Sequence, residues 1–233
     1  NTQSIFAVAI ASNVFSYDSV APQARVLFPP DKSAYNYLLT ISGTALDDFS
    51  GVNELKIQIT YLLAGDTYYW TGVKFDSTTP TEISFTPQSL NATFTSWYYT
   101  DSDLEGANGW VSQRTYLIRV RAKDLSQNWE VYGSTNSFLY DKAPGASYVV
   151  HPVSDGEYGP QKTLPIITGT AQDTPQHPYT TIGEVQVRIK RLSDNRYWDK
   201  TNSTWTLTEN TWNIASSTPQ ATPQSSSIWS LQE

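Results

Sequence analysis

The chain has 233 residues, and its 15 Lys and Arg against 22 Asp and Glu give a formal net charge of −7. That length allows two domains that each bury a core, and the absence of cysteine excludes disulfides and thiolate metal sites. The basic residues are scattered and the longest apolar run, residues 5–11, is too short to span a bilayer, so we expect no nucleic-acid partner and no transmembrane segment.

A pattern of four residues precedes an Ala-Pro pair at two places in the chain. Its members are Asn13, Phe15, Tyr17 and Asp18, and then Asn136, Phe138, Tyr140 and Asp141. Because the second set closes a predicted domain, residues 1–18 are predicted to be the last strand of a preceding repeat. The alternative is a strand donated to a neighbouring subunit, which would join identical subunits end to end by strand addition.

Residues 19–142 are predicted to form one complete repeat of seven strands. The expected strands are residues 24–28, 38–45, 55–62, 67–75, 94–99, 115–122 and 129–140. Alternation sets their faces: Ile57 and Ile59 should point into a core, while Gln58 and Thr60 should face water. Seven short strands separated by Pro, Gly, Asp and Asn favour an antiparallel two-sheet sandwich.

Residues 143–233 are predicted to be a second copy of this repeat. The sequence Gly-Thr-Ala-x-Asp occurs at residues 43–47 and again at 169–173, and Tyr-Trp follows at residues 69–70 and 197–198. Landmarks in the same order indicate an internal repeat. The second copy is expected to be truncated before the counterparts of the last two strands.

These landmarks resemble bacterial immunoglobulin-like (Ig-like) repeats of large secreted and cell-surface proteins. The resemblance is carried by Gly43, Asp47, Gly51, Trp70, Tyr116, Asp124, Asn128, Phe138 and Asp141. It implies an all-β fold of tandem Ig-like antiparallel β-sandwich repeats and an extracellular or cell-surface location. Tyr116 stands where such sandwiches often place a tyrosine that ties a corner through its hydroxyl.

Residues suited to catalysis are scarce. The two histidines, His151 and His177, each precede a proline and lack the spacing of a metal site. No phosphate-binding loop and no nucleophile elbow are present. We therefore expect that the chain is not an enzyme.

Acidic residues fall in loops that an Ig-like sandwich brings to one end. The candidate metal ligands are Asp18, Asp47, Asp48, Asp124 and Asn128. Calcium takes six to eight oxygen ligands, so this set predicts a Ca²⁺ ion that stiffens the joint between repeats. The alternative is that these side chains cap turns by hydrogen bonding to nearby backbone.

A second acidic loop contains Asp101, Asp103 and Glu105 at the spacing of an EF-hand opening. Its twelfth position is Ser112, so the bidentate glutamate of that motif is missing. A solvated loop is the preferred interpretation.

Consecutive aromatic residues at 68–70 and 97–99 require that at least one ring of each group faces outward on a strand, unless a loop covers it. Trp70, Trp97 and Tyr98 are therefore candidate sugar-binding residues, with core filling and contact with another subunit as the alternatives. Asn91 and Asn202 head glycosylation sequons.

Together these features predict an extracellular structural or adhesive segment of a cell-surface stalk or filament. Its Ig-like domains in series would act as a rigid spacer and contact neighbouring repeats. The alternative is a carbohydrate-binding module of a secreted multidomain protein, with glycans as partners.

Overall fold

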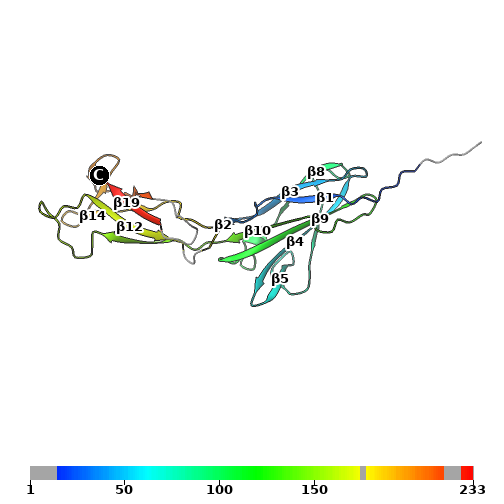
Figure 1. Cartoon of the computed structure of the whole chain (residues 1–233), viewed down its shortest axis with the longest axis horizontal. Coiled ribbons are helices and arrows are strands. Elements are labelled where there is room, and N and C mark those ends of the chain that lie inside the picture. The colour runs from blue at the N-terminus through cyan, green and yellow to red at the C-terminus, as the bar shows by residue number, and fades with distance from the viewer. Residues whose placement is uncertain (1–14, 174–176, 218–226, 233) are drawn as a thin grey trace, which may run out of the picture. The chain divides into compact units, whose positions relative to one another are not determined.

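The computed structural model describes residues 15–173, 177–217 and 227–232, which form an all-β protein built mainly of antiparallel sheets (Figure 1). The strands of the first part are β1 Gln23–Phe28, β2 Ser33–Tyr35, β3 Thr40–Leu46, β4 Val52–Leu63, β5 Asp66–Trp70, β6 Phe75–Ser77, β7 Ile83–Phe85, β8 Phe94–Thr100, β9 Arg114–Asp124 and β10 Ser134–Tyr140. A short 3-10 helix, η1, covers Ser102–Glu105.

The strands that follow are shorter on average. They are β11 Ala146–His151, β12 Ile166–Gln172, β13 Gln186–Val187, β14 Lys190–Arg191, β15 Arg196–Asp199, β16 Thr204–Thr206, β17 Asn213–Ile214, β18 Ser216–Ser217 and β19 Ser227–Gln232. They form a four-stranded sheet β11-β12-β19-β18, a two-stranded sheet β13-β17 and a three-stranded sheet β14-β15-β16.

By their contacts the residues form two compact units. Unit 1 comprises residues 1–30, 39–103 and 117–136, and unit 2 comprises residues 31–38, 104–116 and 137–233. This division runs within β9 and β10 and differs from the domain limits 1–18, 19–142 and 143–233 expected above, which stay a prediction.

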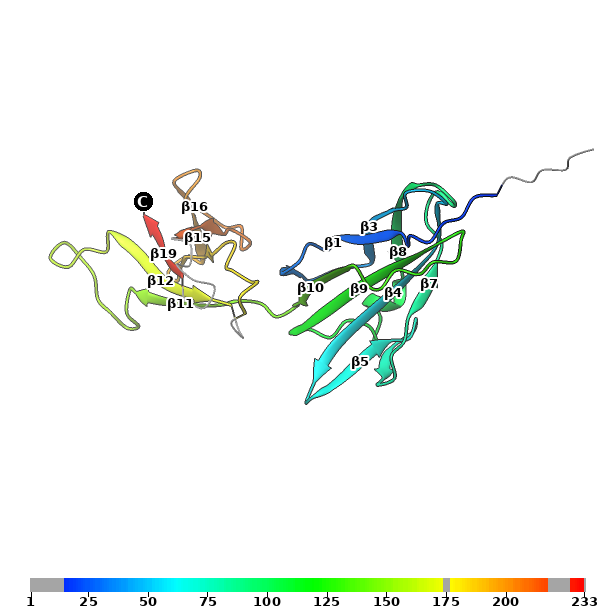
Figure 2. The same ribbon diagram turned by 45° about the vertical axis from the view of Figure 1, so that its right-hand side comes forward.

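Strands β1 to β10 have the order of an immunoglobulin-type sandwich. One sheet is β1-β3-β8, and the other is β2-β10-β9-β4-β5-β6, with β7 paired to β4 (Figure 2). If β1, β3, β4, β8, β9 and β10 are named A, B, C, E, F and G, the sheets are A-B-E and G-F-C, which is the Ig arrangement.

Aromatic side chains fill the space between the sheets of unit 1. Trp70 and Trp97 are each 1% exposed. The indole Nε1 of Trp70 donates to the Tyr99 hydroxyl at 3.0 Å, which joins β5 to β8. The ring of Phe85, on β7, meets that of Trp97 edge to face with centroids 5.6 Å apart. Burial of such large rings dominates the energetics of a core.

Several expected strands match the structure and others differ. Tyr116, Ile118, Val120 and Ala122 are fully buried along β9, as their alternation predicts. Gln58 and Thr60, expected in water, are 8% and 6% exposed, because β4 is a central strand flanked by β9 and β5.

Two strand limits were wrong in the sequence interpretation. The expected strand 67–75 is divided into β5 and β6 by a turn that contains Gly72, at φ +93°. The expected strand 129–140 begins only at Ser134, and the Glu130 carboxylate ahead of it accepts the backbone N–H of Ala24 at 2.8 Å. Glu130 is therefore held against β1 by this hydrogen bond and does not form part of β10.

The predicted strand at residues 1–18 falls mostly outside the described residues. Residues 15–18 lie in no strand, and Phe15 and Tyr17 are 85% and 82% exposed.

Unit 2 buries an apolar cluster that includes side chains of β12 and β19. Its fully buried members are Ala171, Val185, Ala215 and Trp229, with Ile167, Ile182 and Val187 packed against them. Strand β12 pairs with both β11 and β19, so it is central to its sheet.

Candidate functional site

Three aspartates of unit 1 come together from segments far apart in the sequence. Asp18 precedes β1, Asp47 directly follows β3, and Asp124 ends β9. One carboxylate oxygen from each lies within 4.8 Å of the other two. We call these three residues the carboxylate cluster. It contains three of the five predicted metal ligands.

The loop after β3 fixes the Asp47 side chain. Asp47 Oδ2 accepts the backbone N–H groups of Phe49 at 3.0 Å and Gly51 at 2.6 Å. Gly51 has φ +87°, and an added Cβ would lie 2.2 Å from the Asn91 carbonyl oxygen, so only glycine fits this turn. The Gly-Val landmark of the sequence is thus the turn that orients Asp47, which is only 2% exposed.

The loop after β9 fixes Asp124 in a similar way. Asp124 Oδ1 accepts the backbone N–H of Asn128, and Asp124 Oδ2 accepts the Asn128 side-chain amide, both at 2.8 Å. The same amide Nδ2 donates to the carbonyl oxygen of Asp18 at 3.1 Å. Asn128 therefore holds Asp124 and Asp18 together through its amide group, and Asp124 is fully buried.

Asp18 and Asp48 differ in their relation to the cluster. Asp18 Oδ1 accepts the N–H of Val20 at 3.0 Å. The pKa of the Asp18 carboxyl is lowered first by the nearby Ser50 hydroxyl and then by the Val20 N–H. Ser50 Oγ itself is buried and has no hydrogen-bond partner of normal geometry. Asp48, a predicted ligand, is exposed and is not among the clustered carboxylates. Its neighbour Asp47, by contrast, is buried.

Turn capping accounts for part of these contacts, as the alternative interpretation expected. Oxygens of all three aspartates accept nearby backbone N–H groups. Capping leaves other oxygens unused, however: Asp18 Oδ2 and Asp47 Oδ1 are buried atoms without a hydrogen-bond partner.

The second acidic loop is not a second cluster. The Oδ2 of Asp101 accepts the Tyr99 hydroxyl at 2.7 Å, and its Oδ1 accepts the N–H of Asp103 at 3.0 Å. Glu105 Oε1 accepts the Leu38 N–H at 2.6 Å, and its Oε2 accepts the Tyr140 hydroxyl at 2.6 Å and Lys142 Nζ at 3.1 Å. Glu105 thus works as a structural acceptor, where a solvated loop was expected.

We expect Glu105 to make the fold sensitive to acid. Burial alone would raise the pKa of the Glu105 carboxyl, but hydrogen bonds from Tyr140, Leu38 and Lys142 outweigh it and hold the pKa below its usual value. The stabilisation is therefore complete above the unfolded-state pKa of about 4.3 and is lost as pH falls through the folded-state pKa. Glu105→Gln should cost about 1.5–3 kcal/mol at pH 7 and reduce the acid-induced loss of stability, measured by urea denaturation from pH 7 to 3.

Glu209→Gln is the charge-matched control for this measurement, because Glu209 is exposed. Equal acid sensitivity of the Glu105→Gln variant and the unmodified chain would contradict this role of Glu105.

A corner tyrosine is present where the sequence predicts it. Tyr116 is fully buried near the start of β9, and its hydroxyl accepts the backbone N–H of Val111 at 2.7 Å. The ring also meets Trp110 edge to face, with centroids 4.6 Å apart. Its role is therefore structural, as expected.

Two of the three candidate sugar-binding residues lie in the core. Trp70 and Trp97 are core side chains and present no ring face to a ligand, whereas Tyr98 is 55% exposed. Both sequon residues, Asn91 and Asn202, are exposed, although Asn202 Nδ2 donates to Asp199 Oδ2 at 2.8 Å.

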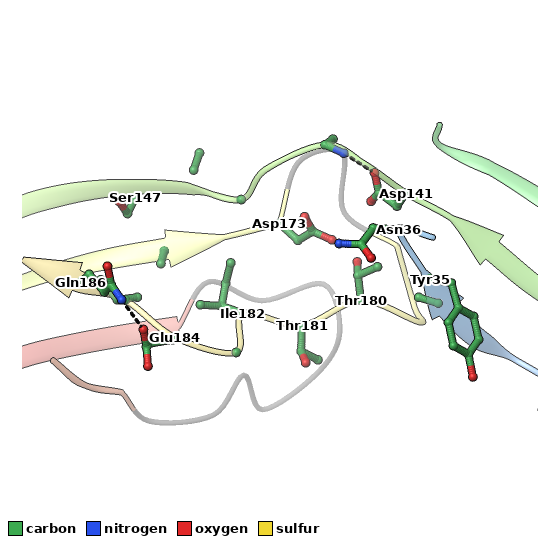
Figure 3. Close-up of a pocket in the computed structure, with 17 residues that line it drawn as sticks. Tyr35, Asn36, Asp141, Ser147, Asp173, Thr180, Thr181, Ile182, Glu184 and Gln186 are labelled. Carbon is green, nitrogen blue, oxygen red and sulfur yellow. Dashed lines mark hydrogen bonds between the residues drawn. The ribbon is translucent and has the colours of Figure 1, made fainter. Parts of the chain in front are cut away.

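Unit 2 contains a cavity of about 570 Å³ with a largely polar lining (Figure 3). Asp141 and Asp173 both lie on its wall. The N–H of Ala143 donates to Asp141 Oδ1 at 2.8 Å, which repeats the contact between Val20 and Asp18. His177 also belongs to unit 2, where burial lowers its pKa and the carboxylates of Asp141 and Asp173 oppose that shift. Among the described residues these side chains form no further cluster of three potential metal ligands.

Fold and site together define an all-β protein with an Ig-type sandwich that carries a buried carboxylate cluster. No family model and no curated protein matches the sequence. A solved structure, described as the crystal structure of a chicken TCR, is similar over 91% of this chain and 89% of its own, at 8% identity and a TM-score of 0.28. That similarity is too low to carry an argument about function. In the described part of the chain no helix has the length and hydrophobicity needed to cross a membrane.

Proposed function

We propose that this chain is a segment of an extracellular structural or adhesive array, in which Ig-like repeats in series act as a spacer. The proposal includes no catalytic role. It draws on the resemblance of the sequence landmarks to bacterial Ig-like repeats of cell-surface proteins, and on one observation about local structure.

The supporting observation is that the same strand arrangement occurs twice. Val26 of β1 pairs with Gly43 of β3, and Val149 of β11 pairs with Gly169 of β12. In both pairs the register shifts directly after the valine. On its other side each glycine pairs with a tryptophan, Trp97 of β8 or Trp229 of β19.

A buried aspartate closes each of these arrangements. Asp47 follows β3 and Asp173 follows β12, and they are 2% and 6% exposed. A similar pairing pattern at two places in one chain supports an array of repeats, in which each repeat would contact mainly its neighbours. Under this proposal the partners are neighbouring repeats or identical subunits, end to end.

The test is surface accessibility on intact cells of the source organism. Antibodies raised against residues 19–142 should stain unpermeabilised cells, and external protease should remove the signal. The denatured native polypeptide should also be several-fold heavier than 26.1 kDa. Staining only after permeabilisation would exclude an extracellular spacer.

The carbohydrate-binding alternative has little support in the described residues. Of its three candidate residues, Trp70 and Trp97 are buried in the core and only Tyr98 is exposed. Binding on a glycan array that is abolished by Tyr98→Ala would favour it nonetheless.

A further inference from the structure

The carboxylate cluster combines strong negative charge with unused buried oxygens. Asp47 is only 2% exposed, and its Oδ1 has no hydrogen-bond partner although its Oδ2 has two. The Oδ2 of Asp18 is likewise buried and unpartnered. Buried polar atoms normally have a hydrogen-bond partner. Burying an oxygen of an ionised carboxylate without such a partner carries a particularly high cost in folding free energy.

Among the described residues, no basic side chain forms an ion pair with the carboxylate cluster. The ion pairs among the described residues all involve other carboxylates, on Glu54, Asp76, Glu82, Glu105 and Asp194. The donor groups at the cluster are neutral, namely backbone N–H groups, the Asn128 amide and the Ser50 hydroxyl beside Asp18. Three carboxylates held close together without a cationic side chain repel one another and lower the stability of the folded state.

We infer that the carboxylate cluster binds a divalent cation of the calcium class. Calcium accepts carboxylate oxygens at 2.3–2.6 Å, so oxygens on opposite sides of the ion are about 4.6–5.2 Å apart. The cluster oxygens, within 4.8 Å of one another, fit inside such a shell. Opposite ligands of Mg²⁺ are only about 4.0–4.2 Å apart, and Mg²⁺ keeps most of its water, which suits this open set of three carboxylates less well.

Neighbouring residues complete and position this ligand set. Asn128 binds both oxygens of Asp124 and the carbonyl of Asp18, so it orients two ligands without being one of them. Ser50 Oγ is buried without a hydrogen-bond partner and lies beside Asp18, where it offers a further oxygen. Water supplies the remaining positions that calcium needs.

The consequence is a connection between three segments of unit 1. The ion would tie the chain entering at Asp18 to the ends of β3 and β9, in addition to the hydrogen bond from Asn128. This inference does not rest on the spacer function, because it concerns only residues within one compact unit.

Calcium titration of the 233-residue chain tests the inference directly. The protein is stripped with a chelator, exchanged into chelator-free buffer with about 150 mM NaCl to screen exposed charges, and titrated with CaCl₂ and separately MgCl₂ in a calorimeter. We expect saturable binding of one Ca²⁺ in unit 1, a higher melting temperature with Ca²⁺, and slower proteolysis between residues 15 and 22. Mg²⁺ should bind more weakly.

Matched variants distinguish the site from general charge screening. Asp18→Asn and Asp47→Asn should weaken Ca²⁺ binding about 10- to 100-fold, whereas Asp48→Asn, with the same change of charge next to the cluster, should leave it unchanged. Asp18 lies outside every strand, so Asp18→Asn remains informative if Asp47→Asn fails to fold. Absence of saturable binding at millimolar Ca²⁺, equal effects of all three variants, or equal affinity for Mg²⁺ would each overturn the inference.

Discussion

Replacing Gly43 or Gly169 by alanine is expected to cost about 3 kcal/mol of folding stability, at the upper end of overpacking effects. A Cβ on Gly43 would lie 1.8 Å from the carbonyl oxygen of Arg25 and 2.4 Å from Cζ2 of Trp97. A Cβ on Gly169 would lie 2.1 Å from the carbonyl oxygen of Tyr148 and 2.2 Å from Cζ2 of Trp229. The nearest atom is backbone in both strand pairs, so the clash cannot be relieved by a rotamer change.

The measurement is urea denaturation followed by tryptophan fluorescence, with each variant compared to the unmodified chain. Gly183→Ala and Gly159→Ala are matched controls in unit 2, because a Cβ at either position meets no atom within 4 Å. These controls should be neutral or slightly stabilising, since alanine reduces the entropy of the unfolded chain. If Gly169→Ala were as mild as Gly183→Ala, the close packing of Trp229 on β12 would be wrong.

Trp97→Ala is expected to cost about 3–5 kcal/mol, whereas the adjacent change Tyr98→Ala should stay within about 0.5 kcal/mol. Trp97 is 1% exposed, packs on Phe85 and donates from Nε1 to the Thr44 carbonyl at 3.1 Å. Tyr98 points to the other face of β8 and is 55% exposed. The two substitutions remove aromatic rings from opposite faces of one strand.

Equilibrium unfolding of both variants checks this difference, with near-UV circular dichroism as a test of retained packing. Similar losses for Trp97→Ala and Tyr98→Ala would contradict the assignment of the two faces. A Trp97→Ala protein with unchanged stability but lost glycan binding would return this residue to the sugar-binding role that its burial argues against.

Much of the strand pattern could be predicted from the sequence. Alternation along residues 116–122 is a local property, because successive side chains of a strand point to opposite faces, and its buried set is confirmed. Alternation could not show that Gln58 and Thr60 are covered, because this depends on which strands flank β4. It also could not choose which aromatic residue faces the core when three are consecutive.

The carboxylate cluster, too, could be predicted from the sequence only in part. The residue types Asp18, Asp47 and Asp124, in loops that an Ig-type order gathers at one end, were sufficient to expect a cluster. The sequence gives no means to separate Asp47 from Asp48, because both are aspartates in one loop and only the backbone after β3 directs one inward. Likewise, the buried oxygens without partners exist only once three distant segments have met.

The all-β class, an antiparallel two-sheet sandwich and the repeated landmarks around Gly43 and Gly169 could be read from the sequence, because these depend on periodicity and on turn residues that act locally. Tertiary structure alone decided that Trp70 and Trp97 belong to the core, that Glu105 is a shared acceptor and that Asp48 lies outside the carboxylate cluster. Burial and hydrogen bonding are properties of neighbours in space, and only the pairing and packing of the sheets assigns those neighbours.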